Sequence, residues 1–198
     1  IKIAEKEKSN ITLTDYGSYK GKNDKGALSA VYQALRLNFT QDFLGKIVIT
    51  EGMTDLYFLE MLRRHTKSIN TDIKIIPGAG SGNSSNLISI GISFSDNFVV
   101  LFDNDRGAKA IKKYLFEFGE EIVKYFHLYS AEPNFTLEDF LSNNEKQRLC
   151  KLTSTNDLKK ALTLLYYDFP DEQKKFFNNL ESETISRLQS TIKRINDL

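Results

Sequence analysis

The sequence predicts an α/β fold: a doubly wound parallel sheet of about four strands, flanked by helices and followed by a helical carboxyl-terminal extension. Short, fully apolar runs recur along the chain, and between them lie segments whose apolar residues repeat every three to four positions. Fully apolar runs are typical of parallel strands that are buried on both faces. Their alternation with helical segments is typical of an open sheet with helices on both sides.

The first 45 residues form an amino-terminal lead-in to that sheet. Apolar residues alternate with polar ones at residues 1–3 and 11–13, which predicts an extended segment followed by a loop. The stretch "GALSAVYQALRLNF" then has helical spacing and predicts a helix over about 26–43, ended by Gly45.

Residues 46–143 contain the regular alternation, and residues 144–198 are helical and more polar. We expect strands over 46–50, 72–77, 97–103 and 122–130. We expect helices over 53–65, 84–92, 107–119, 136–143, 156–168 and 171–197. The boundaries at 45/46 and 143/144 therefore divide the chain into a lead-in, a central α/β domain and a helical extension.

Composition narrows the class of protein. The chain has 198 residues, of which 40% are hydrophobic and 27% charged, and its formal net charge is +1. These values are ordinary for a globular protein, and a polyanion would have to be attracted by local patches or by metal ions. Cys150 is the only cysteine, which excludes an intramolecular disulfide and indicates a reducing compartment. We find no signal peptide and no apolar run that could span a bilayer, so we expect a cytoplasmic protein without a membrane partner.

Carboxylates follow the predicted strands where each strand ends. Glu51 follows the first strand, with Asp55 four residues on; Asp103 and Asp105 follow the third, and Glu138 comes shortly after the fourth. The ligand site of an open α/β sheet lies at the carboxyl ends of its strands, so we expect these side chains to share one rim. Crowded carboxylates repel one another unless a cation neutralises them, and oxygen ligands favour Mg²⁺ or Mn²⁺ over zinc. The sequence therefore predicts a divalent metal site on this rim, with Glu51, Asp55, Asp103 and Asp105 as the residues that point to it.

The spacing of the Asp-Asn-Asp triplet has a geometric meaning. On extended backbone, Asp103 and Asp105 point to the same side, and Asn104 is expected to face the other side and to tolerate substitution. The competing interpretation is an acidic turn, with Asp55 and the pair Glu138-Asp139 as ordinary acidic residues of a first helical turn. The occurrence of acidic residues after several strands favours metal binding, because independent acidic turns need not fall on the same rim.

The glycine-rich segment at 78–83 predicts a flexible loop between the second strand and its helix. It lacks the lysine of a P-loop and the spacing of a dinucleotide-binding fingerprint. Two interpretations stay open: a purely structural loop, or one in which the amides of Gly80, Ser81 and Gly82 approach a substrate phosphate. Lys159 and Lys160 are the candidates for stabilising charge on that phosphate, and their spacing does not separate them.

Four segments carry a resemblance to a known family. "EGMTD" at 51–55 and "FDNDRG" at 102–107 together resemble a Toprim domain, the topoisomerase–primase fold, which is Rossmann-like. With "PGAGSGN" at 77–83 and "LEDFL" at 137–141, the chain most resembles the Toprim half of the OLD (overcoming lysogenization defect) nucleases. The resemblance covers residues 26–142.

The resemblance implies Mg²⁺- or Mn²⁺-dependent cleavage of DNA phosphodiester bonds with two ions. Its implied site residues are Glu51 as ligand or general base, Asp55, Asp103, Asp105 and Glu138 as acidic ligands, with Asp103 and Asp105 also catalytic, and Lys159 or Lys160 as the catalytic lysine. It also implies an amino-terminal ATPase half that dimerises. This chain has no P-loop and begins at Ile1, so we expect that half in the rest of a longer chain or in a partner, and a homo-oligomeric assembly. Relatives of this layout act in bacterial anti-phage defence.

Other functions stay open beside the nuclease. A topoisomerase or primase would share the Toprim motifs, but the first needs a tyrosine-bearing domain and the second a zinc-binding and polymerase context, and neither is visible in the sequence. A non-catalytic Toprim-like module would use the same rim to bind metal or a partner. A phosphoryl-transfer domain of the HAD type would place its D-x-D after the first strand, whereas here the pair follows the third.

Overall fold

The computed structural model describes residues 2–7, 10–15, 45–78, 80, 84–95 and 97–198. The chain divides into two compact units, Ile1–Phe43 and Leu44–Leu198. In the first, β1 (Lys2–Glu7) and β2 (Asn10–Asp15) pair antiparallel, so the predicted extended segments fall in two strands. The helix predicted over 26–43 lies outside the described residues.

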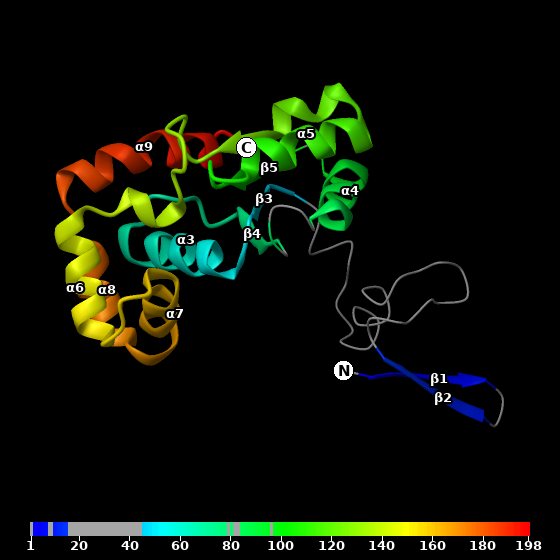
Figure 1. Cartoon of the computed structure of the whole chain (residues 1–198), viewed down its shortest axis with the longest axis horizontal. Coiled ribbons are helices and arrows are strands. Elements are labelled where there is room, and N and C mark those ends of the chain that lie inside the picture. The colour runs from blue at the N-terminus through cyan, green and yellow to red at the C-terminus, as the bar shows by residue number, and fades with distance from the viewer. Residues whose placement is uncertain (1, 8–9, 16–44, 79, 81–83, 96) are drawn as a thin grey trace. The chain divides into compact units, whose positions relative to one another are not determined.

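The second unit is built on a four-stranded parallel sheet, as the apolar runs predict. Its strands are β3 (Ile47–Thr50), β4 (Lys74–Pro77), β5 (Phe98–Phe102) and β6 (Phe126–Leu128). Their order is β4-β3-β5-β6, and each neighbouring pair is parallel (Figure 1). The predicted α/β fold class is confirmed.

The order of the strands reverses between β3 and β5. From β3 the chain passes through α3 (Met53–Thr66) to β4, which pairs with one edge of β3. It then passes through α4 (Ser85–Phe94) to β5, which pairs with the opposite edge of β3. A reversal of this kind is a topological switch point. Open α/β sheets bind their ligands there, outside the carboxyl ends of the two strands.

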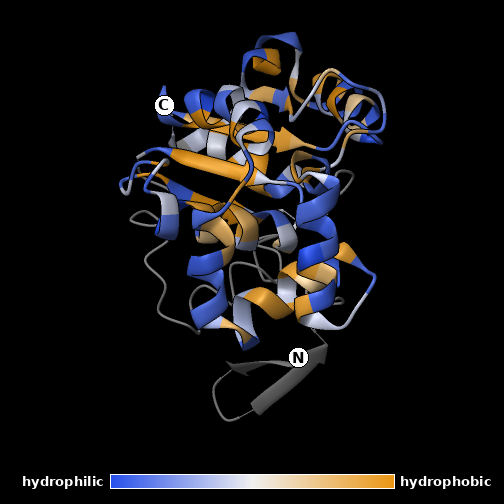
Figure 2. Ribbon diagram, turned by 90° about the vertical axis from the view of Figure 1, so that its left-hand side faces the viewer, coloured by the Kyte–Doolittle hydropathy of each residue, from blue (hydrophilic) through white to orange (hydrophobic). Residues whose placement is uncertain are grey.

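Helices cover both faces of the sheet. On one face, Val48, Val99 and Leu101 share a hydrophobic core with α3. On the other face, the Phe98 ring stacks on Tyr125 with centroids 4.3 Å apart, from the 3₁₀-helix η2 (Glu120–Tyr125). The sheet is accordingly hydrophobic on both sides, while the outward faces of the helices are largely hydrophilic (Figure 2).

The carboxyl-terminal helices extend the α3 layer instead of forming a separate core. They are α6 (Asn143–Thr153), α7 (Leu158–Asp168), α8 (Pro170–Asn178) and α9 (Ser182–Asn196). Phe177 of α8 packs against Phe58 of α3 with ring centroids 5.6 Å apart. The sheet and these helices therefore share one compact unit. Of the helices that the structure describes, none combines the length and the apolar character needed to cross a bilayer.

Three predicted elements differ from those observed. The helix predicted over 171–197 is two helices, because the chain breaks around Leu180 and the N–H of Glu181 donates to Glu145 of α6 at 2.6 Å. The strand predicted over 122–130 is short, because residues 120–125 turn into η2 and bury Ile122 from there. The helix predicted over 136–143 is the single 3₁₀ turn η3 (Leu137–Phe140).

Candidate metal centre

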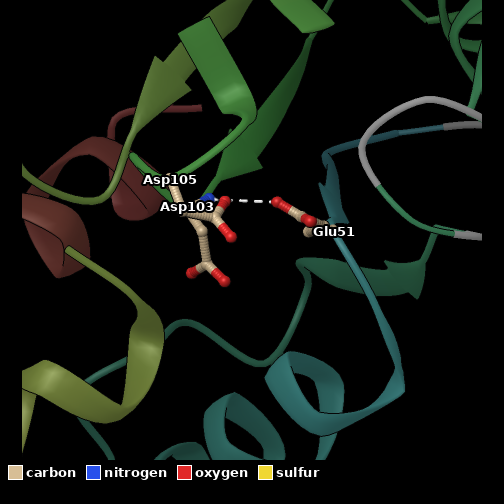
Figure 3. A group of neighbouring side chains, drawn as sticks. All are labelled: Glu51, Asp103 and Asp105. Carbon is tan, nitrogen blue, oxygen red and sulfur yellow. Dashed lines mark hydrogen bonds between the residues drawn. The ribbon is translucent and has the colours of Figure 1, made fainter. Parts of the chain in front are cut away.

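Glu51 and Asp103 lie at the ends of the two strands that flank the switch point. Glu51 follows β3, Asp103 follows β5, and the backbone N–H of Asp103 donates a hydrogen bond of 3.2 Å to Glu51 Oε2 (Figure 3). Glu51, Asp103 and Asp105 each contribute a carboxylate oxygen to a group whose members all lie within 4.8 Å of one another. The structure thus brings three of the five predicted ligands together.

Asp103 and Asp105 converge by a different route from the predicted one. After β5 the backbone is not extended: residues 104–106 form a turn that leads into α5 (Gly107–Phe118). The Gly107 N–H donates to the carbonyl oxygen of Asp103 at 3.1 Å, and the Arg106 N–H donates to Asp105 Oδ1. Asp103 is 3% exposed, whereas Asp105 faces solvent. The acidic turn and the carboxylate group that could hold a metal ion are therefore one feature and not alternatives.

Asn104 is more than a spacer. Its backbone N–H donates to Phe135 at 2.7 Å, and its side-chain amide donates to the carbonyl oxygen of Glu132 at 2.8 Å. These bonds tie the turn of residues 104–106 to the loop between β6 and η3. In contrast to the expectation that Asn104 tolerates substitution, we therefore predict that changes which remove its amide cost stability.

The 3₁₀ turn η3 brings Glu138 toward the site. The N–H of Leu137 donates to Asp103 Oδ1 at 2.8 Å, which places the next residue, Glu138, beside Asp103. Glu138 is 5% exposed, and its Oε1 has no hydrogen-bond partner among the described residues. An unpartnered buried carboxylate oxygen is costly unless a cation or water meets it.

Asp139, the neighbour of Glu138, has a structural role. Its Oδ2 accepts hydrogen bonds from the N–H and hydroxyl of Thr136 at 2.9 and 3.0 Å, and its Oδ1 pairs with Lys146 Nζ at 2.7 Å. Burial raises the pKa of Asp139, but these contacts outweigh it and hold the pKa below its usual range. The interpretation as an acidic first-turn residue therefore fits Asp139, while Glu138 belongs with the cluster.

Asp55 supports Glu51 from the first turn of α3. Its Oδ2 accepts hydrogen bonds from the N–H of Glu51 at 3.1 Å and of Gly52 at 3.4 Å, and from the Tyr129 hydroxyl at 3.3 Å. Asp55 is buried, and it does not belong to the group of three residues whose carboxylate oxygens lie within 4.8 Å of one another. Sequence reasoning missed Tyr129, although its place directly after β6 could have suggested a rim position.

Two buried carboxyl groups are difficult to ionise in this cluster. Burial, and then the charges of Asp55, Glu51 and Glu138, raise the pKa of Asp103 to about 8, against the hydrogen bond from Leu137. Burial and the charge of Glu138 likewise raise the pKa of Asp55 to about 7. With both groups ionised, the rim would carry more negative charge than its surroundings neutralise, and a bound cation would correct this.

Lys159, at the start of α7, is the lysine next to the carboxylates. Its Nζ lies 3.9 Å from Asp103 Oδ2, and the side chain is 59% exposed. Partial burial lowers its pKa, but the surrounding carboxylates outweigh burial and raise it. Lys160 is exposed, and its backbone N–H donates to Asp157 at the start of the same helix. Within the described part of the chain, only Lys159 of the two forms an ion pair with the cluster.

The glycine-rich loop is described in part. Ser81 and Gly82 lie outside the described residues. The N–H of Gly80 donates to the carbonyl oxygen of Glu51 at 2.9 Å, and its own carbonyl oxygen accepts from the Ser84 hydroxyl at 3.1 Å. The Gly80 amide is therefore engaged with the end of β3 and is not available to a phosphate, which corrects the prediction for this residue.

The residues present fit a hard divalent cation. The donors are carboxylate oxygens only, as Mg²⁺ and Mn²⁺ prefer, and Glu138 adds a buried oxygen without a partner. In comparisons with protein-family models, curated proteins and solved structures, none matches this chain.

Proposed function

We propose that this chain is the catalytic, Toprim-type part of a metal-dependent DNA endonuclease of the OLD kind. The observation that carries the proposal is the convergence of Glu51, Asp103 and Asp105 within 4.8 Å at the switch point of the sheet. The resemblance of "EGMTD" and "FDNDRG" to Toprim motifs supports DNA as the substrate.

Glu51, Asp103 and Asp105 would hold Mg²⁺ or Mn²⁺, with Glu138 and Asp55 beside them. When bound, two such ions supply activation of water and neutralisation of the leaving oxygen. The chain supplies the positions: Asp103 is held by the Leu137 N–H and through its own N–H to Glu51. These two backbone hydrogen bonds join η3 and the ends of β3 and β5, so the carboxylates are held in position before substrate arrives.

Two side chains act on the substrate directly in this proposal. Glu51 acts either as a ligand or as the general base. As the general base, it accepts a proton from the attacking water on a carboxylate oxygen. Lys159, whose ammonium lies 3.9 Å from Asp103, neutralises charge that develops on the phosphate. Its raised pKa keeps it protonated at neutral pH.

Nicking of supercoiled plasmid with Mn²⁺ tests the proposal. We compare the wild type with Asp103→Asn, which keeps the shape but removes the charge, and with Asp72→Asn as a matched control. Asp72 pairs with Lys46 beside the amino-terminal ends of β3 and β4, away from the rim. We expect Asp103→Asn to lose at least about 100-fold in rate and Asp72→Asn to stay within about twofold. Equal rates for all three proteins, or nicking that EDTA leaves unchanged, would overturn the proposal.

The competing functions give different results in the same assay. Relaxed topoisomers would favour a topoisomerase, and incorporation of ribonucleotides would favour a primase. Binding of Mn²⁺ in calorimetry without nicking would favour a non-catalytic metal-binding module.

The resemblance also proposes a context. It suggests an ATPase half in the rest of a longer chain or in a partner, a homo-oligomeric assembly, a cytoplasmic location and a role in anti-phage defence, all of which belong to the proposal. Light scattering of the purified chain tests the assembly, because a mass of one chain, 22.7 kDa, would show that this part does not assemble alone.

A further inference from the structure

A row of cations starts in the turn of residues 104–106, directly after Asp103, and continues along α5. Arg106 directly precedes this helix, and Lys109, Lys112 and Lys113 follow on it, all exposed. The sequence from Arg106 to Phe116 contains no acidic residue. We call these four cations the α5 basic row. It concentrates positive charge in a chain whose net charge is only +1.

The packing of α5 fixes where the row points. Gly107, Ala110 and Tyr114 are the buried residues of the helix, and the Tyr114 ring stacks on Phe102 of β5 with centroids 6.0 Å apart. The Tyr114 hydroxyl also accepts a hydrogen bond of 2.9 Å from the Ser84 N–H. The exposed cations lie on other faces of the same helix, so a rigid element presents them to solvent.

Ion pairs distinguish three cations of the row, Arg106, Lys109 and Lys112, from lysines elsewhere in the described part of the unit. In the described residues, Lys146 pairs with Asp139 and Lys175 pairs with Glu172, both at 2.7 Å. No ion pair to a described carboxylate involves Arg106, Lys109 or Lys112. Like charges this close repel one another, and an external polyanion would relieve that repulsion.

The row is joined directly to the candidate metal centre. The N–H of Arg106 donates to Asp105, and the N–H of Gly107 donates to Asp103, so the helix begins in the turn that holds two carboxylates. From residue 106 to residue 113 a helix rises about 10 Å, which is the rise of about three nucleotides along one DNA strand. A strand with one phosphate at the metal centre can therefore follow the row with its next phosphates.

We propose that the α5 basic row binds the phosphate backbone of duplex DNA and holds it against the metal centre without reading sequence. The inference rests on the proposed function for its substrate, but it concerns binding, which is measured without cleavage. Lysines on an exposed helix face contact phosphates as point charges, so they give affinity and register, and their contribution falls with salt.

Fluorescence anisotropy with a labelled 20-base-pair duplex tests the inference. All proteins carry Asp103→Asn, so that the DNA stays intact. The test pair is Lys109→Glu with Lys112→Glu, and the control pair is Lys151→Glu with Lys174→Glu, which makes the same charge change on exposed positions of α6 and α8. We expect the test pair to bind at least about tenfold more weakly at 50 mM salt, with the slope of log K against log salt smaller by about two, and the control pair to stay within about twofold.

Two outcomes would overturn the inference. The first is equal weakening by both pairs, which would mean that only net charge matters; the second is binding by the test pair that matches its parent. Charge reversal could disturb the helix, and circular dichroism checks this. The milder pair Lys109→Gln with Lys112→Gln covers that case, and we expect its DNA affinity to lie between those of the parent and the test pair. Binding of the parent to anionic lipid vesicles but not to DNA would also overturn it.

The nicking assay separates this inference from the proposed function. Binding through α5 by a protein whose wild type does not nick plasmid would refute the nuclease and leave the DNA surface standing. Nicking by the wild type together with normal binding by the test pair would refute the α5 surface alone.

Discussion

The backbone N–H of Asp103 donates to the carboxylate of Glu51 at 3.2 Å, and this bond joins the ends of β3 and β5. One carboxylate therefore serves as a structural acceptor and as a member of the acidic group within 4.8 Å. Substitutions at Glu51 can separate the two roles, because a neutral amide can keep the hydrogen bond and lose the charge.

Glu51→Gln should fold normally and fail to bind metal. Its amide oxygen can still accept from Asp103, so we expect the melting temperature to stay within about 2 °C of the wild type. Its affinity for Mn²⁺ in calorimetry should fall at least about tenfold, because a charged ligand is lost. Glu51→Ala should lose affinity and also melt at a lower temperature. Unchanged Mn²⁺ affinity in Glu51→Gln would remove Glu51 from the metal site.

Lys159 and Lys160 should differ in their effect on nicking. Lys159 lies 3.9 Å from Asp103 Oδ2, whereas Lys160 is exposed and forms no ion pair with the described carboxylates. We expect Lys159→Ala to slow Mn²⁺-dependent plasmid nicking by about 100-fold and Lys160→Ala to change it less than about threefold. A larger loss in Lys160→Ala would reverse the assignment.

Without metal, stability should fall as the pH rises. Asp103 and Asp55 have pKa values of about 8 and about 7 in the folded chain against an ordinary 3.8, so the folded state holds their protons more tightly than the unfolded state does. Their contribution is fully present below about pH 4 and is lost as the pH passes through 7 and 8.

Melting temperatures at pH 5, 6.5 and 8, in EDTA and in Mn²⁺, check this dependence. Mn²⁺ should raise the melting temperature most at pH 8, where it replaces the missing protons. Asp103→Asn cannot ionise at this position and should show a flatter dependence in EDTA. A wild-type melting temperature in EDTA that rises from pH 6.5 to pH 8 would contradict the raised pKa values.

Tyr129→Phe should reduce the stability of the rim. The Tyr129 hydroxyl donates to Asp55 Oδ2, which also accepts from the N–H groups of Glu51 and Gly52. Removing it should lower the free energy of unfolding by about 1 kcal/mol in urea denaturation. Tyr125→Phe is the matched control, because the described contact of Tyr125 with Phe98 uses its ring and not its hydroxyl. Equal effects of the two substitutions would mean that the Asp55 contact contributes nothing particular.

Gly107→Ala should be poorly tolerated. A Cβ at this position would lie 2.7 Å from Phe102 Cβ and 2.9 Å from Leu128 Cδ2, so α5 would have to move away from the sheet. We expect a loss of about 1–3 kcal/mol in the free energy of unfolding. A Cβ at Gly52 meets no atom within 4 Å, which makes Gly52→Ala the control. Equal stability of the two variants would show that α5 adjusts without cost.

The sequence predicts where the strands lie better than it predicts where helices end. The apolar runs predict the four strands well because burial on both faces requires apolar residues at every position, as in Ile47, Val48 and Ile49. Local pattern cannot show where tertiary contacts end an element. The break near Leu180 depends on a hydrogen bond from Glu181 to Glu145, which lies 36 residues away.

The site divides in the same way. Glu51 and Asp103 are predictable because each follows a strand, and parallel strands end at the same edge. The difference between Glu138 and Asp139 is not predictable from sequence, since it depends on which of them meets Thr136 and Lys146. The choice of Lys159 over Lys160 likewise depends on how α7 packs.

The topological switch point also determines at which stage of folding the acidic group of Glu51, Asp103 and Asp105 forms. Glu51 and Asp103 are 52 residues apart and come from strands that are not consecutive, so a chain that has formed only β3, α3 and β4 holds at most Glu51 and Asp55. The long loop must close and β5 must insert beside β3 before the acidic group exists. During synthesis, the acidic group therefore forms only when the sheet is nearly complete, and any metal site built on it would be absent from unfinished chains.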